Sequence, residues 1–126
     1  MNRPLVLIVE DNDKNLKLAR DVLQLDGLRT IEAVDGATGI ELARAHHPDV
    51  VLLDIQLPDM DGTEVLARLR TISHLASTPV VAVTAYAMSG DRERLLAAGF
   101  DDYVSKPISV GTFSTLVRSY VAATRG

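Results

Sequence analysis

Three short apolar runs, each uninterrupted by a charged residue, constrain the fold of this chain more than any other feature. They cover residues 5–9 (Leu-Val-Leu-Ile-Val), 50–53 (Val-Val-Leu-Leu) and 79–83 (Pro-Val-Val-Ala-Val). Continuous runs rich in valine and leucine are typical of strands that are covered on both faces, as in a parallel sheet. Two weaker strand candidates lie at residues 28–34 and 101–105.

Stretches with the apolar spacing of amphipathic helices separate these strand candidates. Gly27 and Gly99 stand where a left-handed residue would close the first and fourth helices. Five alternations of strand and helix predict an α/β fold with a parallel sheet, right-handed crossovers and helices on both faces. The apolar positions are Leu16, Ala19 and Leu23 in the first helix, Ile40 and Ala43 in the second, and Val65, Leu66 and Leu69 in the third; the fourth helix is expected at residues 89–98, and the fifth carries Val110, Phe113, Leu116, Val117, Tyr120 and Val121 on one stripe.

Length and composition exclude several classes of function. We expect 126 residues to form one domain, residues 1–126, around a single core. With 13 Lys and Arg against 17 Asp and Glu, the net charge of −4 predicts no direct nucleic-acid binding and no binding to an anionic membrane. The longest apolar runs are also far too short to span a bilayer. The chain has no cysteine, which excludes thiol chemistry and suits the cytoplasm, where we expect the protein.

Polar residues follow four of the strand candidates: Glu10-Asp11, Asp54, Thr84 and Lys106. In an open parallel sheet the carboxyl ends of the strands meet at one edge, and ligands bind there. Two unit charges about 4 Å apart near a protein surface repel by roughly 4 kcal/mol, so three carboxylates at this edge require a cation or shared protons. The sequence therefore predicts a hard metal ion beside Asp54.

These residue types can support phosphoryl transfer. A carboxylate can act as a nucleophile and form an acyl phosphate when the charge of the phosphoryl group is neutralised. Mg²⁺, or Mn²⁺ as the alternative ion, prefers oxygen ligands, which Asp11 and Asp54 could supply directly and Glu10 through water. Lys106 could contact a phosphoryl oxygen as a point charge, and Thr84 offers a hydroxyl.

The same residues lie in motifs that resemble the receiver domains of two-component response regulators, over essentially the whole chain. Val9-Glu10-Asp11-Asn12 is similar to the acidic turn of that family, and residues 53–62 (Leu-Asp-Ile-Gln-Leu-Pro-Asp-Met-Asp-Gly) are similar to its phosphoacceptor loop. Val83-Thr84-Ala85 resembles the segment with the switch threonine, and Lys106-Pro107 resembles the lysine and the proline that follows it.

The resemblance implies a flavodoxin-like fold with strand order 2-1-3-4-5 and five helices. It implies that Asp54 accepts a phosphoryl group from a histidine kinase or a histidine phosphotransfer protein. Mg²⁺ would be held by Asp11, Asp54 and the backbone carbonyl of Gln56, and the peptide bond between Lys106 and Pro107 is expected to be cis. Tyr103 matches the aromatic switch position that acts with the threonine. A downstream protein partner would bind the face formed by the fourth helix, the fifth strand and the fifth helix.

Within the family, residues 84–91 and 106–108 are more similar to single-domain regulators of the DivK type, or to receivers of hybrid kinases, than to receivers of transcription factors. Because the chain ends just past the fifth helix, we expect no output domain, unless the chain is a receiver excised from a hybrid histidine kinase or a phosphorelay intermediate. Gln56 and Tyr86 occupy variable positions that influence the lifetime of the phosphoryl group in this family.

Simpler interpretations remain for single residues. Asp54 could cap a turn, Thr84 could be an ordinary strand residue, Lys106 a solvated charge and Tyr103 a half-buried aromatic. His46, His47 and His74 have no third ligand at suitable spacing, and we interpret them as surface residues.

Two other functions compete with the phosphorylation switch. A phosphatase of the haloacid dehalogenase type also uses a strand-end aspartate, but it requires a second acid where this chain has Gln56. A receiver-like scaffold that is never phosphorylated is the third hypothesis. We expect no conventional enzyme, but a phosphoacceptor that catalyses its own phosphorylation from small donors and its own dephosphorylation.

Overall fold

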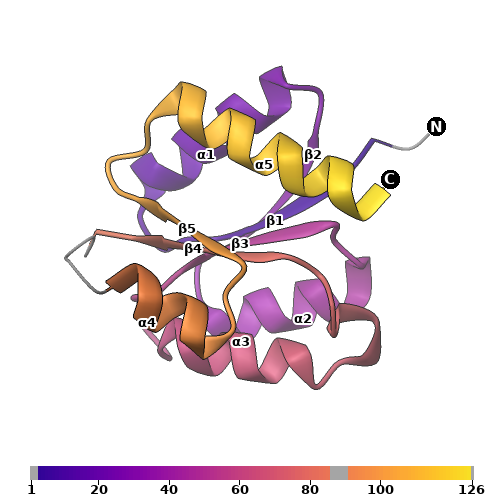
Figure 1. Ribbon diagram of the computed structural model, residues 1–126, viewed down its shortest axis with the longest axis vertical. Helices are drawn as coiled ribbons and strands as arrows, with labels where there is room; N and C mark the ends of the chain where they lie inside the picture. Colours follow the sequence, from indigo (N-terminus) through magenta and orange to yellow (C-terminus); the bar gives the residue numbers. More distant parts are fainter. Residues whose placement is uncertain (1–2, 86–90, 126) are drawn as a thin grey trace.

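The computed structural model describes residues 3–85 and 91–125 and forms one five-stranded parallel sheet (Figure 1). The strand order is β2-β1-β3-β4-β5, as predicted, with every neighbouring pair parallel. The strands are β1 (Leu5–Val9), β2 (Arg29–Ala33), β3 (Val50–Asp54), β4 (Val80–Thr84) and β5 (Asp102–Ser105).

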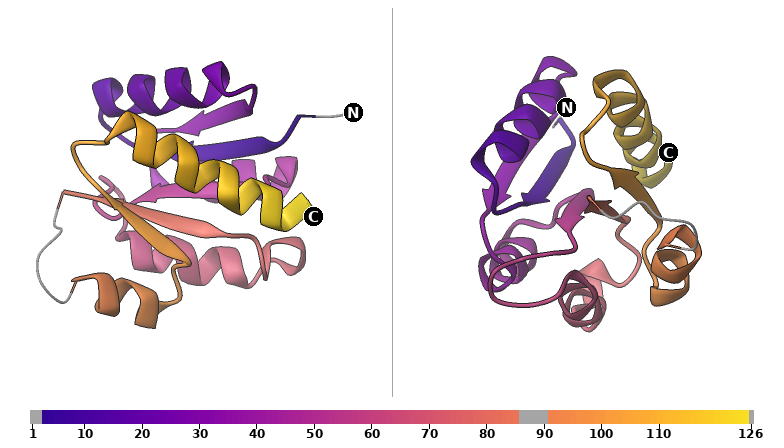
Figure 2. Two further views of the ribbon diagram at one scale, coloured as in Figure 1. Left: turned by 45° about the horizontal axis from the view of Figure 1, so that its top comes forward. Right: turned by 90° about the vertical axis from the view of Figure 1, so that its left-hand side faces the viewer.

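Helices cover both faces of the sheet, and Figures 1 and 2 show α1 and α5 on one face and α2, α3 and α4 on the other. The predicted doubly wound α/β fold is therefore confirmed. The helices are α1 (Asp13–Leu25), α2 (Gly36–His46), α3 (Gly62–Arg70), α4 (Asp91–Ala98) and α5 (Val110–Arg125), with a short 3₁₀ helix, η1 (Ser73–Leu75), before β4. No helix in the described part of the chain has the length and apolar character needed to cross a membrane.

The three continuous apolar runs form the central strands because both of their faces are buried. In β1, Val6 and Ile8 pack against α1 and α5, whereas Leu7 and Val9 pack against α2 and α3. All five residues of β1, β3 and β4 are buried, whereas the edge strand β2 has only one buried residue, Ala33. This difference explains why the edge strand gave the weaker pattern in the sequence.

Helix boundaries follow local chemistry. Asn12, Asp35 and Asp61 cap α1, α2 and α3, and each side chain accepts hydrogen bonds from backbone N–H groups of the first turn. Gly27 and Gly99 have φ values of +83° and +112°, as expected for residues that close helices.

The first residues of α5 and α4 bear on two of the sequence predictions. Val110 does not belong to the buried stripe of α5, because it lies at the first position of the helix and is 51% exposed. The fourth helix is described from Asp91, so the earlier start expected at Ser89 lies outside the described residues, as does Tyr86.

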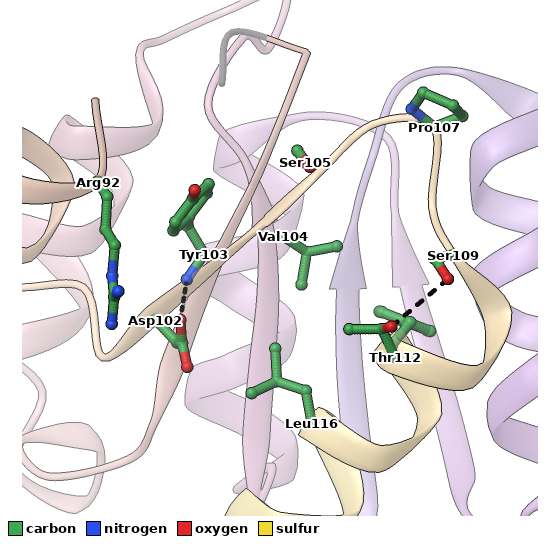
Figure 3. Close-up of a pocket in the computed structure, with 10 residues that line it drawn as sticks. Arg92, Asp102, Tyr103, Val104, Ser105, Pro107, Ser109, Thr112 and Leu116 are labelled. Carbon is green, nitrogen blue, oxygen red and sulfur yellow. Dashed lines mark hydrogen bonds between the residues drawn. The ribbon is translucent and has the colours of Figure 1, made fainter. Parts of the chain in front are cut away.

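A cavity of about 400 Å³ lies where α4, β5 and α5 meet (Figure 3). Arg92 from α4, Tyr103 from β5 and Leu116 from α5 are among the residues that line it. Tyr103 is half-buried and packs against the core on the α4 side of the sheet.

Candidate functional site

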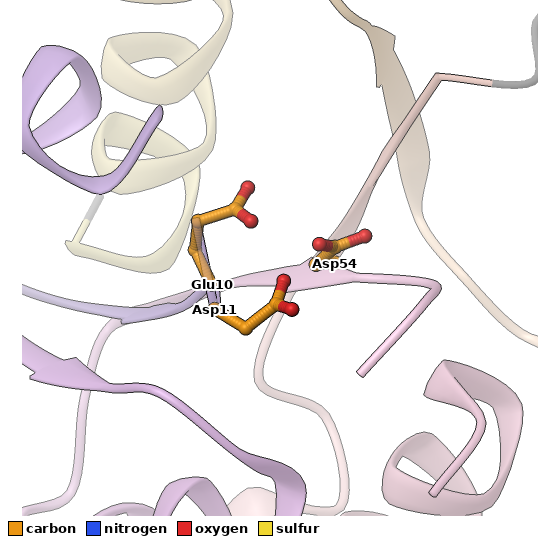
Figure 4. A group of neighbouring side chains, drawn as sticks. All are labelled: Glu10, Asp11 and Asp54. Atoms are coloured by element: carbon orange, nitrogen blue, oxygen red, sulfur yellow. The ribbon is translucent and has the colours of Figure 1, made fainter. Parts of the chain in front are cut away.

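Three acidic residues meet at the carboxyl edge of the sheet. Glu10 and Asp11 follow β1, and Asp54 is the last residue of β3, the neighbouring strand. One carboxylate oxygen from each of the three lies within 4.8 Å of the others, and Figure 4 shows Asp11 and Asp54 converging. Glu10 and Asp54 are buried, whereas Asp11 is exposed.

Lys106 reaches the same cluster from the end of β5. Its Nζ lies 2.8 Å from Glu10 Oε1 and 3.1 Å from Asp54 Oδ2. The backbone helps to place it, because the Lys106 N–H donates to the carbonyl oxygen of Thr84 at 2.8 Å. The peptide bond between Lys106 and Pro107 is cis. We expected this ammonium to contact a phosphoryl group, and the structure places it between two carboxylates.

The electrostatics of the cluster favour a divalent cation. With every group ionised, three carboxylates and one ammonium carry a net charge of −2. Burial raises the pKa of Glu10 to about 7, with Lys106 acting in the opposite direction and Asp54 adding to the increase. Burial alone would lower the pKa of Lys106, but its contacts with Glu10 and Asp54 outweigh that effect and raise the pKa.

Both oxygens of Asp54 have a hydrogen-bond donor. Oδ2 accepts from Lys106, and Oδ1 accepts from the backbone N–H of Gln56 at 3.0 Å. The carboxylate is therefore held in one orientation at the edge of a cavity of about 410 Å³. The lining residues include Asp11, Asn12, Asn15, Asp54, Gln56, Leu57, Pro58, Thr84, Ala85 and Lys106.

Thr84 is the last residue of β4 and lies next to Asp54 in the sheet. The register pairs Asp54 with Val83 and Thr84 with Ser105, so Thr84 lies between β3, which ends at Asp54, and β5, which Lys106 follows. Thr84 is buried and lines the cavity. The structure thus brings Glu10, Asp11, Asp54, Gln56, Thr84 and Lys106 together, whereas Tyr103 lines the separate cavity between α4 and α5.

The donor set suits Mg²⁺. Hard divalent ions prefer carboxylate, carbonyl and water oxygens, and this cluster supplies three carboxylates. Together with the Lys106 ammonium they carry a net charge of −2, which would balance the charge of a 2+ ion. Two asparagine residues that the sequence did not identify as site residues, Asn12 and Asn15, also line the cavity beside the acids. The signal in the sequence was their position directly after the acidic pair, where Asn12 caps α1 and Asn15 lies in its first turn.

The chain is similar in sequence to proteins of one known family. Residues 6–118 match the model of the response regulator receiver domain, and the chain belongs to this family of two-component signalling proteins. It is 48% identical over 116 residues to the polar-differentiation response regulator DivK of Brucella ovis, an alignment that covers 92% of this chain and 94% of that protein. The DivK of Brucella anthropi is 47% identical over the same shares.

Solved structures agree with the fold. The receiver domain of a sensor histidine kinase from Pseudomonas aeruginosa, which has a magnesium ion coordinated in the active site cleft, superposes with a TM-score of 0.87 at 30% identity, over 96% of this chain and 99% of that chain. The signal receiver domain of a LuxO repressor protein from Vibrio parahaemolyticus gives a TM-score of 0.90 at 26% identity, over 98% and 94% of the two chains.

Proposed function

We propose that this receiver domain is a phosphorylation switch in which Asp54 accepts a phosphoryl group from a histidine of a sensor kinase or a phosphotransfer protein. The observation that carries the proposal is the placement of the Asp54 carboxylate, which lies within 4.8 Å of carboxylate oxygens of Glu10 and Asp11 and 3.1 Å from the Lys106 ammonium. We propose that the reaction takes place in the cytoplasm, which the absence of cysteine suits.

Four residues are proposed to hold Mg²⁺. Asp11 and Asp54 would ligate it through carboxylate oxygens, Gln56 through its backbone carbonyl, and Glu10 through water. When bound, the ion would neutralise charge on the phosphoryl oxygens. A contact between Asn12 N–H and Glu10 Oε2 of 3.1 Å orients the buried Glu10 carboxylate in the acidic turn.

The transfer step forms one bond and breaks one bond. A carboxylate oxygen of Asp54 attacks the phosphorus atom of the donor phosphohistidine and forms an acyl phosphate. The P–N bond breaks, and the imidazole nitrogen keeps its electron pair. Lys106 can then exchange its contact with Asp54 for a phosphoryl oxygen, and the Thr84 hydroxyl can donate to another phosphoryl oxygen.

We propose that the output is a change in protein contacts rather than turnover of a substrate. New contacts at Thr84 and Lys106 would favour one of two conformations, with Tyr103 as the aromatic switch residue. The α4–β5–α5 face would bind the downstream partner, and its cavity beside Tyr103 supports this assignment.

The proposal is tested by incubating the protein with Mg²⁺ and acetyl phosphate or carbamoyl phosphate and then measuring its intact mass. The switch requires one phosphoryl adduct per chain, and the adduct must be absent from Asp54→Asn and after addition of EDTA. Rapid release of inorganic phosphate without an adduct would indicate a phosphatase. If the protein formed no adduct and released no phosphate, it would be a scaffold that is not phosphorylated.

A second candidate is a receiver that passes its phosphoryl group on, as in a hybrid kinase or a phosphorelay. The similarity to the receiver domain of a Pseudomonas aeruginosa sensor kinase supports this alternative. Phosphorylated protein mixed with a histidine phosphotransfer protein separates the two roles. Rapid loss of the adduct, matched by phosphohistidine on the second protein, would identify the relay role.

A further inference from the structure

The loop between β3 and α3 is held to a second element far from Asp54 in the sequence. This loop, residues 55–61, carries the backbone of Gln56, the proposed carbonyl ligand. Asp59 Oδ1 accepts a hydrogen bond from the N–H of Gly36 at 2.8 Å, and Asp59 Oδ2 accepts one from the N–H of Ala37 at 2.9 Å. One carboxylate therefore joins the metal-binding loop to the first turn of α2.

These two bonds are not the ordinary cap of α2. The helix has its own N-cap residue, Asp35, whose Oδ1 accepts from the N–H of Thr38 at 2.8 Å. Asp59 satisfies two further N–H groups of the first turn, which an isolated helix would leave without partners. The same two bonds lower the pKa of Asp59, with the Gly36 contact as the larger cause, so the carboxylate is charged at neutral pH.

A close apolar contact beside Asp59 supports the same attachment. A Cβ atom on Gly36 would lie 2.6 Å from Met60 Cγ and 2.9 Å from Met60 Sδ. Only glycine lets Met60 pack this closely against α2. Adjacent loop residues thus contact the start of α2 through two different kinds of interaction.

The end of the loop that follows β3 is hydrogen-bonded to Asp54. The Gln56 N–H donates to Asp54 Oδ1 at 3.0 Å, and Gln56 also pairs with Asp61 in an isolated bridge. Gln56 therefore lies between the phosphoacceptor candidate and the part of the loop that Asp59 attaches to α2. A displacement at either end of this short loop should therefore shift the backbone of Gln56.

We infer that Asp59 is a positioning residue that couples the metal site to the first turn of α2. This inference rests on the proposed function, because it concerns the loop that would supply the carbonyl ligand of Mg²⁺. Thermodynamic coupling is reciprocal, so Mg²⁺ bound at the site must also stabilise the contact between Asp59 and α2. The metal site and the first turn of α2 would then stabilise each other through the Asp59 carboxylate.

Asp35→Ala is the matched control for Asp59→Ala. Each change removes a carboxylate that accepts from the N-terminal turn of α2, but only Asp59 belongs to the loop. Asp59→Asn keeps one acceptor oxygen and replaces the other with a donor, so it provides a milder variant if Asp59→Ala fails to fold.

Amide hydrogen exchange without metal gives the first readout. We expect Asp59→Ala to reduce the protection of the Gln56 amide about tenfold, which corresponds to about 1.4 kcal/mol. Asp35→Ala should leave the Gln56 amide unchanged, and Asp59→Asn should fall between the two. Equal effects of Asp35→Ala and Asp59→Ala on Gln56 would overturn the inference.

Calorimetric titration with MgCl₂ gives the second readout. We expect the Kd for Mg²⁺ to rise roughly threefold to tenfold in Asp59→Ala and to stay at the parent value in Asp35→Ala. Saturating Mg²⁺ should increase the protection of the Gly36 and Ala37 amides in the parent protein. An unchanged Kd in Asp59→Ala would refute the role of Asp59 alone, whereas a parent protein that does not bind Mg²⁺ would refute the proposed function.

Discussion

Lys106 Nζ lies 3.1 Å from Asp54 Oδ2, although 52 positions separate the two residues in the sequence. The same ammonium lies 2.8 Å from Glu10, so a single cation links the ends of β1, β3 and β5. Its side chain is largely buried, as are those of both carboxylates. The contact between Lys106 and Asp54 therefore contributes to the stability of the site as well as to its proposed chemistry.

Lys106→Ala should destabilise the metal-free protein by about 1–3 kcal/mol, because two buried carboxylates lose their shared donor. Removal of a positive charge should also strengthen Mg²⁺ binding, while adduct formation from acetyl phosphate slows. Urea unfolding followed by circular dichroism, with and without Mg²⁺, measures the first two effects. Lys17→Ala is the control, since the exposed Lys17–Asp21 pair should contribute little to stability. Equal losses in the two variants would contradict the prediction.

The affinity for Mg²⁺ should increase as the pH rises through 7. Burial raises the pKa of Glu10 from 4.5 to about 7, so the metal-free fold favours the protonated acid. Its contribution to stability is complete below pH 4.5 and is lost as the pH rises through 7. A cation competes with that proton and binds best once Glu10 is ionised. Calorimetric titrations on both sides of pH 7 measure this, and Glu10→Gln should show a weaker dependence on pH.

The sequence could predict the sheet and the position of the acids because both follow from local pattern. Buried strands require continuous apolar runs, and the parallel topology places every strand end at one edge. Asp54 and Thr84 end β3 and β4, and Lys106 follows β5 directly, so the fold determines their neighbourhood.

The contacts of individual side chains were beyond such patterns. The bonds from Gly36 and Ala37 to Asp59 join segments more than 20 positions apart and depend on the path of a loop. His47, which adopts φ +52° at the end of α2, stacks on His74 with ring centroids 3.7 Å apart. Sequence spacing contains no information on either pairing, since each is a consequence of tertiary packing.

Gly62→Ala should destabilise the protein and disturb the site. An added Cβ would lie 2.8 Å from the Cα of Ile55 and 3.0 Å from the carbonyl oxygen of Asp54, so the backbone beside Asp54 must shift. We expect a loss of about 1–3 kcal/mol in the free energy of unfolding and slower adduct formation.

Gly111→Ala is the control for this change. Gly111 is exposed in α5, and a Cβ there would have no atom within 4 Å. The helix should gain up to about 1 kcal/mol from the substitution. Urea unfolding of both variants tests the pair, and a stability of Gly62→Ala equal to that of the parent protein would show that the backbone accommodates a methyl group without cost.

Arg70→Met should remove a link at the opposite edge of the sheet. Arg70 Nη1 donates to the carbonyl oxygens of Leu75 at 3.0 Å and Thr78 at 2.6 Å, and Nη2 donates to Asp101 Oδ2 at 3.1 Å. Asp101 Oδ2 also accepts from the N–H of Val80 at 2.8 Å. The loss of three bonds, two of them part-buried, should cost about 1–3 kcal/mol.

Arg68→Met tests whether this cost is specific to Arg70. Arg68 lies in the same last turn of α3, but its guanidinium contacts the exposed Glu64, at 2.8 Å. An exposed pair of this kind contributes less than about 0.5 kcal/mol. Thermal unfolding should therefore separate the variants by several degrees, and amide exchange at Val80 should accelerate only in Arg70→Met. Faster exchange at Val80 in Arg68→Met as well would mean that α3 as a whole, rather than the Arg70–Asp101 contact, holds the start of β4.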